Sequence, residues 1–319
     1  MTSVSPDPAI ACHDHNDIAA KLFEQGYCVV ENAVPRALVN ALRDDIEPIF
    51  EQTALSVGPF YGETTKRLHG LLRRSGHMAS FVLQPEILAA VRAVLGEACD
   101  TIQLNLTQAI EILPGGLPQP PHRDQDMWPL RTAGLEYLVN VMWPFTEYSA
   151  ENGATLVWPG SHLRQDEIVI DEDEAVAVEM SPGSALLFLG STLHAGGANR
   201  TERPRRGMIV SYSLGWLKPY ELPWLAYPPQ VARHFPKALA ELAGYRVHRP
   251  NLGTHEGRCP SQLLANAQAP LGAIDSLRPE QEELIALYRS GALRTERSGG
   301  WLVILCQPNC TPYLLRSAR

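Results

Sequence analysis

The chain has 319 residues, with 27 Lys plus Arg against 35 Asp plus Glu, which gives a formal net charge of −8 at pH 7. Neutralising phosphates requires a concentrated basic surface, so this balance disfavours a nucleic-acid partner. With 45% hydrophobic and 19% charged residues, the chain is too apolar for a disordered protein. The 24 Gly and 26 Pro residues indicate many turns, as expected of short strands with frequent connections.

The start of the chain has neither a basic segment nor an apolar core, so no signal peptide is expected. No apolar run approaches the roughly 20 residues that span a bilayer, and we expect no membrane association. The six cysteines are scattered rather than dense, at Cys12, Cys28, Cys99, Cys259, Cys306 and Cys310. This distribution predicts reduced thiols in a cytoplasmic protein.

The first hundred residues show mostly helical periodicity, which predicts a helical N-terminal part over residues 16–96. Residues 16–26 predict a short amphipathic helix capped by Asp17, and residues 27–30 predict a strand behind it. Pro35 stands where the first residue of a second helix is expected, and residues 85–95 predict a third.

The period of the apolar residues changes from near 3.6 to 2 at residue 101. Over residues 101–113, apolar side chains alternate with amides and hydroxyls, which predicts a strand with one apolar face and one solvated polar face. Further strands are expected at residues 136–143, 154–158, 175–179, 185–189 and 207–216. Such even spacing favours a jelly-roll core over residues 100–217. Helices are expected at residues 229–244 and 279–290, and a short strand at residues 301–306.

The segment His122-Arg123-Asp124 directly follows the long alternating strand and its Gly-Gly turn. An extended backbone would direct His122 and Asp124 to the same face, and His194 is available downstream as a third ligand. Two histidines and one carboxylate on one face of an octahedron form the facial triad of non-haem Fe(II) oxygenases. The same residues suit zinc with an open coordination position, so a zinc hydrolase or isomerase remains an alternative.

Arg205 stands eleven residues after His194, at the start of a predicted strand. A guanidinium held near Fe(II) can bind the distal carboxylate of 2-oxoglutarate bidentately while the keto-acid end chelates the metal. Arg205 and Arg206 would alternate between the two faces of the strand, so only one of them should point inward. Zinc chemistry has no need of such an arginine, which favours iron.

Several neighbouring motifs have simpler explanations than metal binding. His15-Asn16-Asp17 repeats the His-x-Asp spacing, but it lies in a polar N-terminal stretch and is interpreted as a chance occurrence. His162 is expected to stabilise a turn by a hydrogen bond. Asp126 and Trp128 are candidates for one wall of the substrate pocket, with a packed tryptophan as the alternative.

Two charged clusters also stand out. A basic group could receive a carboxylate or a CoA phosphate, and a solvated helix face explains it equally well. Its members are Lys66, Arg67, His69, Arg73, Arg74 and His77. The acidic group over residues 166–174 lacks the spacing and glycine of a calcium loop, so we interpret it as an exposed connection.

Four blocks in order resemble the phytanoyl-CoA dioxygenase family of Fe(II)/2-oxoglutarate oxygenases, over about residues 16–260. The blocks are His122-Arg123-Asp124, Glu151-Asn152-Gly153-Ala154-Thr155 through Pro159-Gly160-Ser161-His162, His194 with Gly196-Gly197-Ala198-Asn199, and Arg205. The resemblance implies a mainly β fold with flanking helices and a double-stranded β-helix core, which is a cupin-like jelly roll. It implies that His122, Asp124 and His194 bind iron and that Arg205 binds 2-oxoglutarate. The subgroup that tailors terpenoids and alkaloids also uses a glutamine and a threonine, here Gln119 and Thr155.

The resemblance implies an enzyme that uses Fe(II), 2-oxoglutarate and O2 to oxidise an unactivated C–H position of a small molecule, with release of succinate and CO2. The outcome is hydroxylation, desaturation or rearrangement, because halogenases of this kind leave the position of Asp124 small so that chloride can bind. An acyl-CoA or carrier-bound acyl hydroxylase remains open, and so does an inactive binding scaffold.

The residues beyond about position 260 match no pattern that we recognise. We therefore expect a dioxygenase domain over residues 1–260 and a C-terminal extension over residues 261–319. The role of the extension stays open between covering the pocket, forming a homodimer contact and lacking order.

Overall fold

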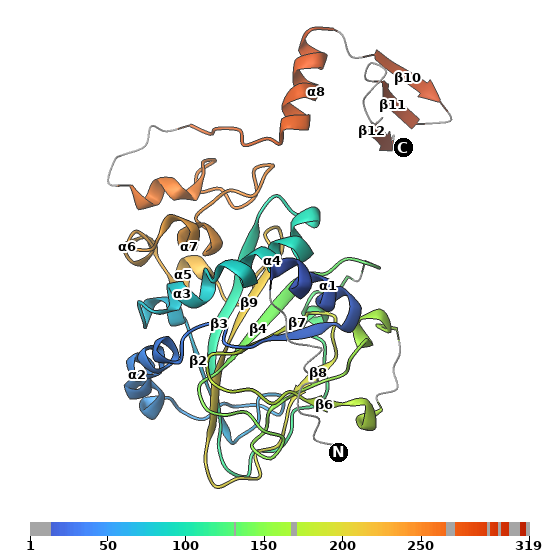
Figure 1. Ribbon diagram of the computed structural model, residues 1–319. Helices are drawn as coiled ribbons and strands as arrows, with labels where there is room; N and C mark the ends of the chain where they lie inside the picture. Colours follow the sequence, from blue (N-terminus) through green and yellow to red (C-terminus); the bar gives the residue numbers. More distant parts are fainter. Residues whose placement is uncertain are drawn as a thin grey trace.

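The structure is a computed structural model that describes residues 14–130, 132–166, 171–265, 272–291, 294–298, 301–305 and 313–316. Two antiparallel sheets form a jelly roll (Figure 1). The major sheet has the order β1 (Tyr27–Val30), β7 (Ala185–Leu189), β4 (Leu138–Pro144), β9 (Arg205–Leu214), β3 (Ile102–Ile112) and β2 (Thr65–His69). The minor sheet has the order β6 (Val176–Ala177), β5 (Thr155–Val157) and β8 (His194–Gly196).

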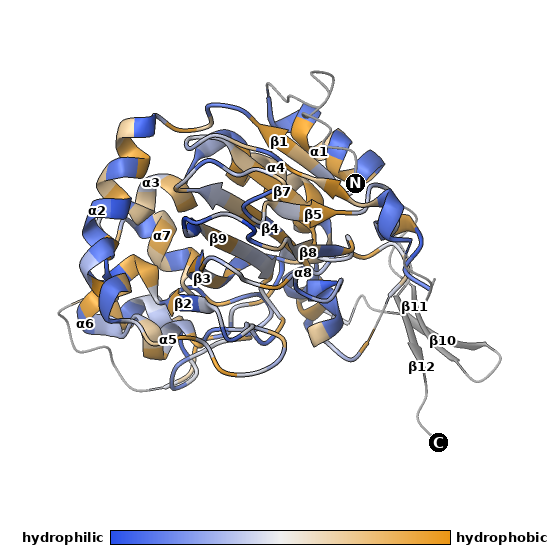
Figure 2. Ribbon diagram, turned by 90° about the horizontal axis from the view of Figure 1, so that it is seen from below, coloured by the Kyte–Doolittle hydropathy of each residue, from blue (hydrophilic) through white to orange (hydrophobic). Residues whose placement is uncertain are grey.

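Helices cover the outer face of the major sheet. They are α1 (His15–Gln25), α2 (Arg36–Gln52), α3 (Met78–Val82), α4 (Pro85–Leu95), α5 (Pro223–Ala226), α6 (Pro229–Ala232) and α7 (Lys237–Leu242). In α2 the buried residues Val39, Leu42, Ile46 and Phe50 recur at helical spacing, and Figure 2 shows hydrophobic and hydrophilic residues alternating along this helix. The expected mainly β fold with flanking helices is therefore confirmed.

The C-terminal elements are α8 (Pro279–Arg289) and a small antiparallel sheet. The strands of that sheet are β10 (Arg294–Ser298), β11 (Trp301–Leu305) and β12 (Tyr313–Arg316). The strand expected at residues 301–306 thus coincides with β11.

The major sheet separates two hydrophobic clusters. On its outer face, Val139 and Val141 of β4 pack with the helices. On its inner face, Met142 and Ile209 pack against Val157 of the minor sheet. Because both faces are covered, β4, β7 and nearly all of β9 are buried along their length.

A β-bulge changes which side chains of β3 face the interior of the jelly roll. The register of β3 against β9 shifts between Leu104 and Leu106, so Asn105 is the extra residue. Before the bulge, Leu104 belongs to the helix-facing cluster, whereas Ile110 after it belongs to the inner cluster. The prediction of one continuous apolar face was wrong for this reason, and the polar residues of β3 are buried rather than solvated.

Several expected elements have different bounds in the structure. Asp14 rather than Asp17 caps α1, because the Asp14 carboxylate accepts hydrogen bonds from the first backbone amides of the helix. Pro35 is the N-cap of α2 rather than its first helical residue. The helix expected over residues 229–244 is divided into α6 and α7, with Pro236 at the N-cap of α7.

The basic group does not lie on a helix face. Residues 65–69 form the edge strand β2, which pairs with β3, and the rest of the group follows in a 3-10 turn at Leu71–Arg73 and the residues before α3. Because successive side chains of a strand point to opposite faces, neighbouring members of the group are separated. Lys66 donates to a carbonyl of α2, whereas Arg67 lines the inner cavity.

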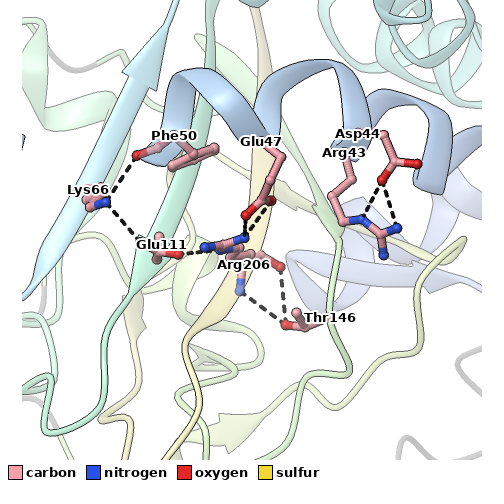
Figure 3. Close-up of polar contacts among 8 residues, drawn as sticks. All are labelled: Arg43, Asp44, Glu47, Phe50, Lys66, Glu111, Thr146 and Arg206. Atoms are coloured by element: carbon pink, nitrogen blue, oxygen red, sulfur yellow. Dashed lines mark hydrogen bonds and ion pairs between the residues drawn. The ribbon is translucent and has the colours of Figure 1, made fainter. Parts of the chain in front are cut away.

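Arg206 connects helix α2 to the sheet (Figure 3). Its guanidinium donates hydrogen bonds to the carboxylates of Glu47 on α2 and Glu111 on β3. Lys66 lies 3.8 Å from the second oxygen of Glu111, whose side chain is almost completely buried. This cluster neutralises the Glu111 charge, which would otherwise be costly to bury.

We expect Arg206→Met to lower the free energy of unfolding by about 3 kcal/mol, because it leaves Glu111 without its main partner. Urea denaturation of the purified variant measures this loss. Arg43→Met is the matched control, since Arg43 lies on α2, the helix that Arg206 contacts, and forms an ion pair with its exposed neighbour Asp44. Its expected change is within about 0.5 kcal/mol, and equal losses in both variants would contradict the prediction.

No helix in the described part of the chain is long and apolar enough to cross a membrane. Cys28 and Cys99 are buried, and Cys259 is half-buried. The remaining cysteines of the sequence, Cys12, Cys306 and Cys310, lie outside the described residues.

Candidate metal and co-substrate site

The backbone brings His122 and His194 together although they are far apart in the sequence. The two residues form an antiparallel bridge in which each backbone amide donates to the carbonyl of the other, at 2.9 Å in both directions. The imidazole rings lie 4.3 Å apart between centroids. Pairing across the bridge therefore places both rings on one side of the backbone.

Asp124 completes the group. It is the first residue of a 3-10 turn, Asp124–Met127, and the backbone is extended at Arg123 before it. Its Oδ1 lies 3.5 Å from Nε2 of His122, and its Oδ2 lies 3.6 Å from Nε2 of His194. One potential ligand atom from each residue lies within 4.8 Å of the others, which is a separation that a single metal ion can bridge.

Hydrogen bonds orient the three side chains from behind. Nδ1 of His122 lies 2.9 Å from the carbonyl of Pro120, and Nδ1 of His194 lies 3.1 Å from that of Thr192. If each Nδ1 carries the proton, both Nε2 lone pairs face the third ligand, Asp124. The buried amide of Asn140 donates to Oδ2 of Asp124 at 2.8 Å.

The electrostatics favour an ionised Asp124 carboxylate beside a neutral His194 imidazole. Burial acts to raise the pKa of Asp124, but His194, His122 and the Asn140 amide outweigh it and hold that pKa below its ordinary value. Burial, reinforced by the neighbouring His122, lowers the pKa of His194 to about 4. Near neutral pH Asp124 and His194 are thus in the protonation states that bind a divalent cation, and two nitrogens with one oxygen suit Fe(II).

Arg205 is the arginine of the pair that points inward. In the β3–β9 register Arg206 lies opposite Glu111 and Arg205 lies opposite Ile112, so they occupy opposite faces. The Arg205 side chain is 2% exposed, and its guanidinium carbon lies 4.0 Å from the centroid of the Tyr148 ring. Burial lowers the pKa of this guanidinium.

Arg205 and Thr155 each carry a buried polar atom that lacks a hydrogen-bond partner among the described residues, Nε and Oγ1 respectively. Both side chains line the cavity that contains the triad. Buried polar groups are normally hydrogen bonded. The pair therefore fits an oxygen-rich anion such as 2-oxoglutarate, which would supply the missing partners.

Gln119 and Thr155 come close to the metal ligands by separate routes. The Oε1 of Gln119 accepts the Gly196 amide at 3.1 Å, two residues beyond His194. Thr155 lies opposite Gly196 in the β5–β8 pairing. Before Thr155, the turn at Gly153 packs so closely that a Cβ there would lie 2.6 Å from the carbonyl oxygen of Gly197. Only glycine allows this approach of the two motifs.

Arg67 is a cavity residue that the sequence pattern placed in the basic group without separating it from the other members. It lies opposite Ile110 in the β2–β3 register and donates to Oε1 of Gln108 at 2.8 Å. Burial lowers the pKa of its guanidinium. The sequence signal that could have placed Arg67 in the cavity is the strand-like alternation of side chains over residues 65–69. Interpreting the group as part of a helix face conceals this alternation.

The other candidates lie outside the cavity. His162 is buried and lies 2.9 Å from the carbonyl of Phe23, so its contact supports α1. Trp128 packs against the helix-facing cluster and donates to the carbonyl of Lys218, as expected of a packed tryptophan. Asp126 is exposed, and Met127 between them lines the cavity instead.

We expect Asn140→Ala to weaken Fe(II) binding about 10- to 100-fold, the usual effect of removing a group that orients a metal ligand. Competition with a chelator measures the affinity. The matched control is Gln103→Ala, which removes another buried amide of the major sheet that bonds to the carbonyls of Leu214 and Leu217. An equal loss of affinity in both variants would mean that destabilisation, and not carboxylate orientation, is responsible.

Two proteins of known name illustrate the sequence similarity. The chain is 34% identical over 197 residues to "Dioxygenase FrzG" from Cladobotryum sp, which covers 57% of this chain and 63% of that protein. It is 27% identical over 297 residues to "Dioxygenase olcK" from Penicillium canescens, which covers 85% of this chain and 97% of that protein.

Solved structures show the same fold. The carbocyclase SnoK from nogalamycin biosynthesis matches 64% of this chain and 87% of its own, with a TM-score of 0.52 and 21% identity. The epimerase SnoN, described in complex with Fe3+, alpha ketoglutarate and nogalamycin RO, matches 69% of this chain and 90% of its own, with a TM-score of 0.54 and 22% identity. These likenesses support the jelly-roll assignment.

The family model "Phytanoyl-CoA dioxygenase (PhyH)" matches residues 22–207, more than half of the chain. This range includes His122, Asp124, His194 and Arg205. The chain belongs to the phytanoyl-CoA dioxygenase family of Fe(II)/2-oxoglutarate-dependent oxygenases.

Proposed function

We propose that this dioxygenase oxidises an unactivated C–H position of a small-molecule natural product, with His122, Asp124 and His194 holding iron. When bound, iron with 2-oxoglutarate and O2 supplies the oxidising chemistry, with succinate and CO2 as co-products. The observation that carries the proposal is the presence of the triad, the unpaired Arg205 and Thr155 in a single cavity. A zinc hydrolase would need the triad but not the two polar groups.

The three ligands leave one side of the site open to the cavity. Asp124 bridges the space between the two imidazoles, and backbone carbonyls hold both rings in place. The ring of Phe60 lies edge-on to His122, and that of Phe188 lies 4.5 Å from His194. These aromatic side chains exclude water from the imidazoles on the sides that face the protein.

Arg205 is proposed to bind the distal carboxylate of 2-oxoglutarate. A guanidinium offers two parallel N–H donors that match a carboxylate, and the apolar surroundings of Arg205 strengthen this interaction. Thr155 supplies a hydroxyl beside it, and Gln119 orders the strand that carries His194. Arg67 gives the cavity a second positive charge, which suits a co-substrate with two carboxylates.

The basic group offers little support for an acyl-CoA substrate. A CoA phosphate requires several free cations on one surface, whereas Lys66 bonds to the Phe50 carbonyl and Arg74 bonds to the His69 carbonyl. Arg67 faces the inner cavity instead. We therefore propose a small molecule over an acyl-CoA, with residues 1–260 as the catalytic domain and residues 261–319 as an extension.

The test combines binding with turnover. Under anaerobic conditions, the purified protein should bind Fe(II) and then 2-oxoglutarate, with a visible charge-transfer absorption that neither produces alone. In air, a library of natural products and acyl-CoA esters should then show succinate released with an oxidised product by mass spectrometry. Failure to bind 2-oxoglutarate in the iron-loaded protein would overturn the proposal, and oxidation of the acyl-CoA esters alone would overturn the substrate class.

A further inference from the structure

Two tyrosines meet across the cavity, and the proposed reaction gives neither of them a role. The hydroxyl groups of Tyr61 and Tyr220 are hydrogen bonded to each other, although the residues are 159 positions apart in the sequence. Both side chains line the cavity of the triad. Tyr61 belongs to the connection between α2 and β2, and Tyr220 belongs to the segment that follows β9.

Tyr220 is held firmly by the sheet. Its backbone amide donates to Oδ1 of Asn105 at 2.8 Å, and the next amide, of Glu221, donates to the Asn105 carbonyl at 3.0 Å. Asn105 is the bulge residue of β3, so its carbonyl and side chain are available to accept hydrogen bonds from the segment that contains Tyr220. The Tyr220 ring also stacks on His69 at 5.9 Å. Burial and the bond to Tyr61 raise the pKa of Tyr220 to about 12, so its hydroxyl remains protonated near neutral pH.

Tyr61 lies in a segment that belongs to no helix or strand. The turn from Gly58 to Gly62 is closed by a backbone hydrogen bond of 3.1 Å, and both glycines have positive φ angles, which other residues rarely adopt. At the β2 end, the Thr65 hydroxyl donates to the carbonyls of Tyr61 and Gly62, and the Arg67 guanidinium lies over the Tyr61 ring. Phe60 is 44% exposed, contacts the His122 ring edge-on and accepts a bond of 3.3 Å from Gln119 at its carbonyl. The hydroxyl bond of Tyr61 joins this segment to the chain beyond β9 on the other side of the cavity.

The cavity is small in this closed arrangement. Its volume is about 110 Å³, whereas sites for drug-sized ligands typically enclose about 300–1,000 Å³. Apolar and partly exposed side chains border it at Phe60, Leu117 and Met127. A co-substrate and a multi-ring molecule cannot both fit unless one bordering segment moves, and residues 56–62 are a bordering segment that belongs to no helix or strand.

We propose that the hydrogen bond between Tyr61 and Tyr220 is a latch that holds residues 56–62 over the cavity. Release of this bond admits the substrate that is oxidised, a small molecule with an apolar skeleton. Tyr220 is the fixed half and Tyr61 the moving half. The inference rests on the proposed function only in that the cavity is taken as the active site. Its test needs no iron, 2-oxoglutarate or turnover, so the two can fail separately.

Hydrogen–deuterium exchange of the unliganded protein tests the latch. Tyr61→Phe, Tyr220→Phe and the double variant each keep the rings and remove the shared bond. We expect exchange over residues 53–64 to rise about fivefold in each single variant, the factor for one lost hydrogen bond, and no further in the double variant. Tyr245→Phe is the matched control, because it removes a hydroxyl bond of 2.8 Å to the Tyr227 carbonyl elsewhere in the fold.

Opening of the cavity is followed with the fluorescent dye 1-anilinonaphthalene-8-sulfonate, an anion whose aromatic rings bind exposed apolar surface. We expect the three latch variants to bind more dye than the wild-type protein and than Tyr245→Phe. Unchanged exchange over residues 53–64, or separate effects that add in the double variant, would overturn the latch. Faster exchange without additional dye binding would also overturn it, because the segment would then move without opening the cavity.

Discussion

His194→Ala should abolish metal-dependent activity, with a loss of iron affinity and 2-oxoglutarate turnover well beyond the roughly 100-fold of an orienting residue. His194 supplies one of three ligand groups, and an imidazole cannot be replaced by water without loss of the facial arrangement. Residues 194 and 122 are joined by a backbone bridge, and alanine at position 194 keeps that bridge while removing the imidazole. Iron binding by competition titration and succinate release together measure the effect.

Two controls separate ligation from other consequences of losing a histidine. His15→Ala changes the other His-x-Asp sequence, whose Asp17 lies in the first turn of α1, so iron affinity should stay at the wild-type value. His162→Ala removes a similarly buried ring that contacts the Phe23 carbonyl, so it should lower thermal stability and leave iron affinity intact. If His162→Ala lost iron as His194→Ala does, fold damage would explain both.

Arg205→Met should raise the KM for 2-oxoglutarate about 100-fold or more, because it removes a charged and bidentate partner of the co-substrate from a buried position. The same change should leave the free energy of unfolding unaltered or higher. Arg205 forms no ion pair with a described residue, so in the unliganded fold the contact with the Tyr148 ring is set against the cost of burying its charge. Kinetic titration of 2-oxoglutarate and urea denaturation give the two quantities.

The neighbouring Arg206 provides the matched comparison. Arg206→Met is expected to destabilise the protein through Glu111 and Glu47, with the KM for 2-oxoglutarate within about twofold of wild type under conditions where the variant is folded. We thus expect Arg205→Met to lose affinity for 2-oxoglutarate without losing stability, and Arg206→Met to lose stability without losing that affinity. A loss of 2-oxoglutarate affinity in Arg206→Met equal to that in Arg205→Met would contradict the assignment of the inner face to Arg205.

Local signals in the sequence identified much of the fold. The strand at residues 27–30, the helix at residues 85–95 and the strand at residues 185–189 have the expected bounds, because their apolar periods and turn residues lie close together in the chain. The sequence also pointed to His122, Asp124 and His194, because four blocks of the family pattern occur together in order, and the structure brings these three side chains together. Their binding of iron remains a prediction for the experiments above.

Other parts of the site depend on long-range pairing. A period of two shows that Arg205 and Arg206 face opposite ways, but only the pairing of β9 with β3 and α2 decides which of them is inside. Arg67 reaches the cavity and Asn140 reaches Asp124 in the same way, through strand partners distant in the sequence. The bulge at Asn105 has no local signature, and it moves every later side chain of β3 to the opposite face.

The sequence by itself therefore determined the chemistry available to this protein: two histidines, one carboxylate and one arginine in an order typical of its family. The tertiary structure decided which of the neighbouring groups join them. Residue types and local periods act over a few positions, whereas the face and register of a strand are set by the surfaces that it packs against. The Tyr61–Tyr220 contact is of the second kind, because it exists only where two segments meet across the finished jelly roll.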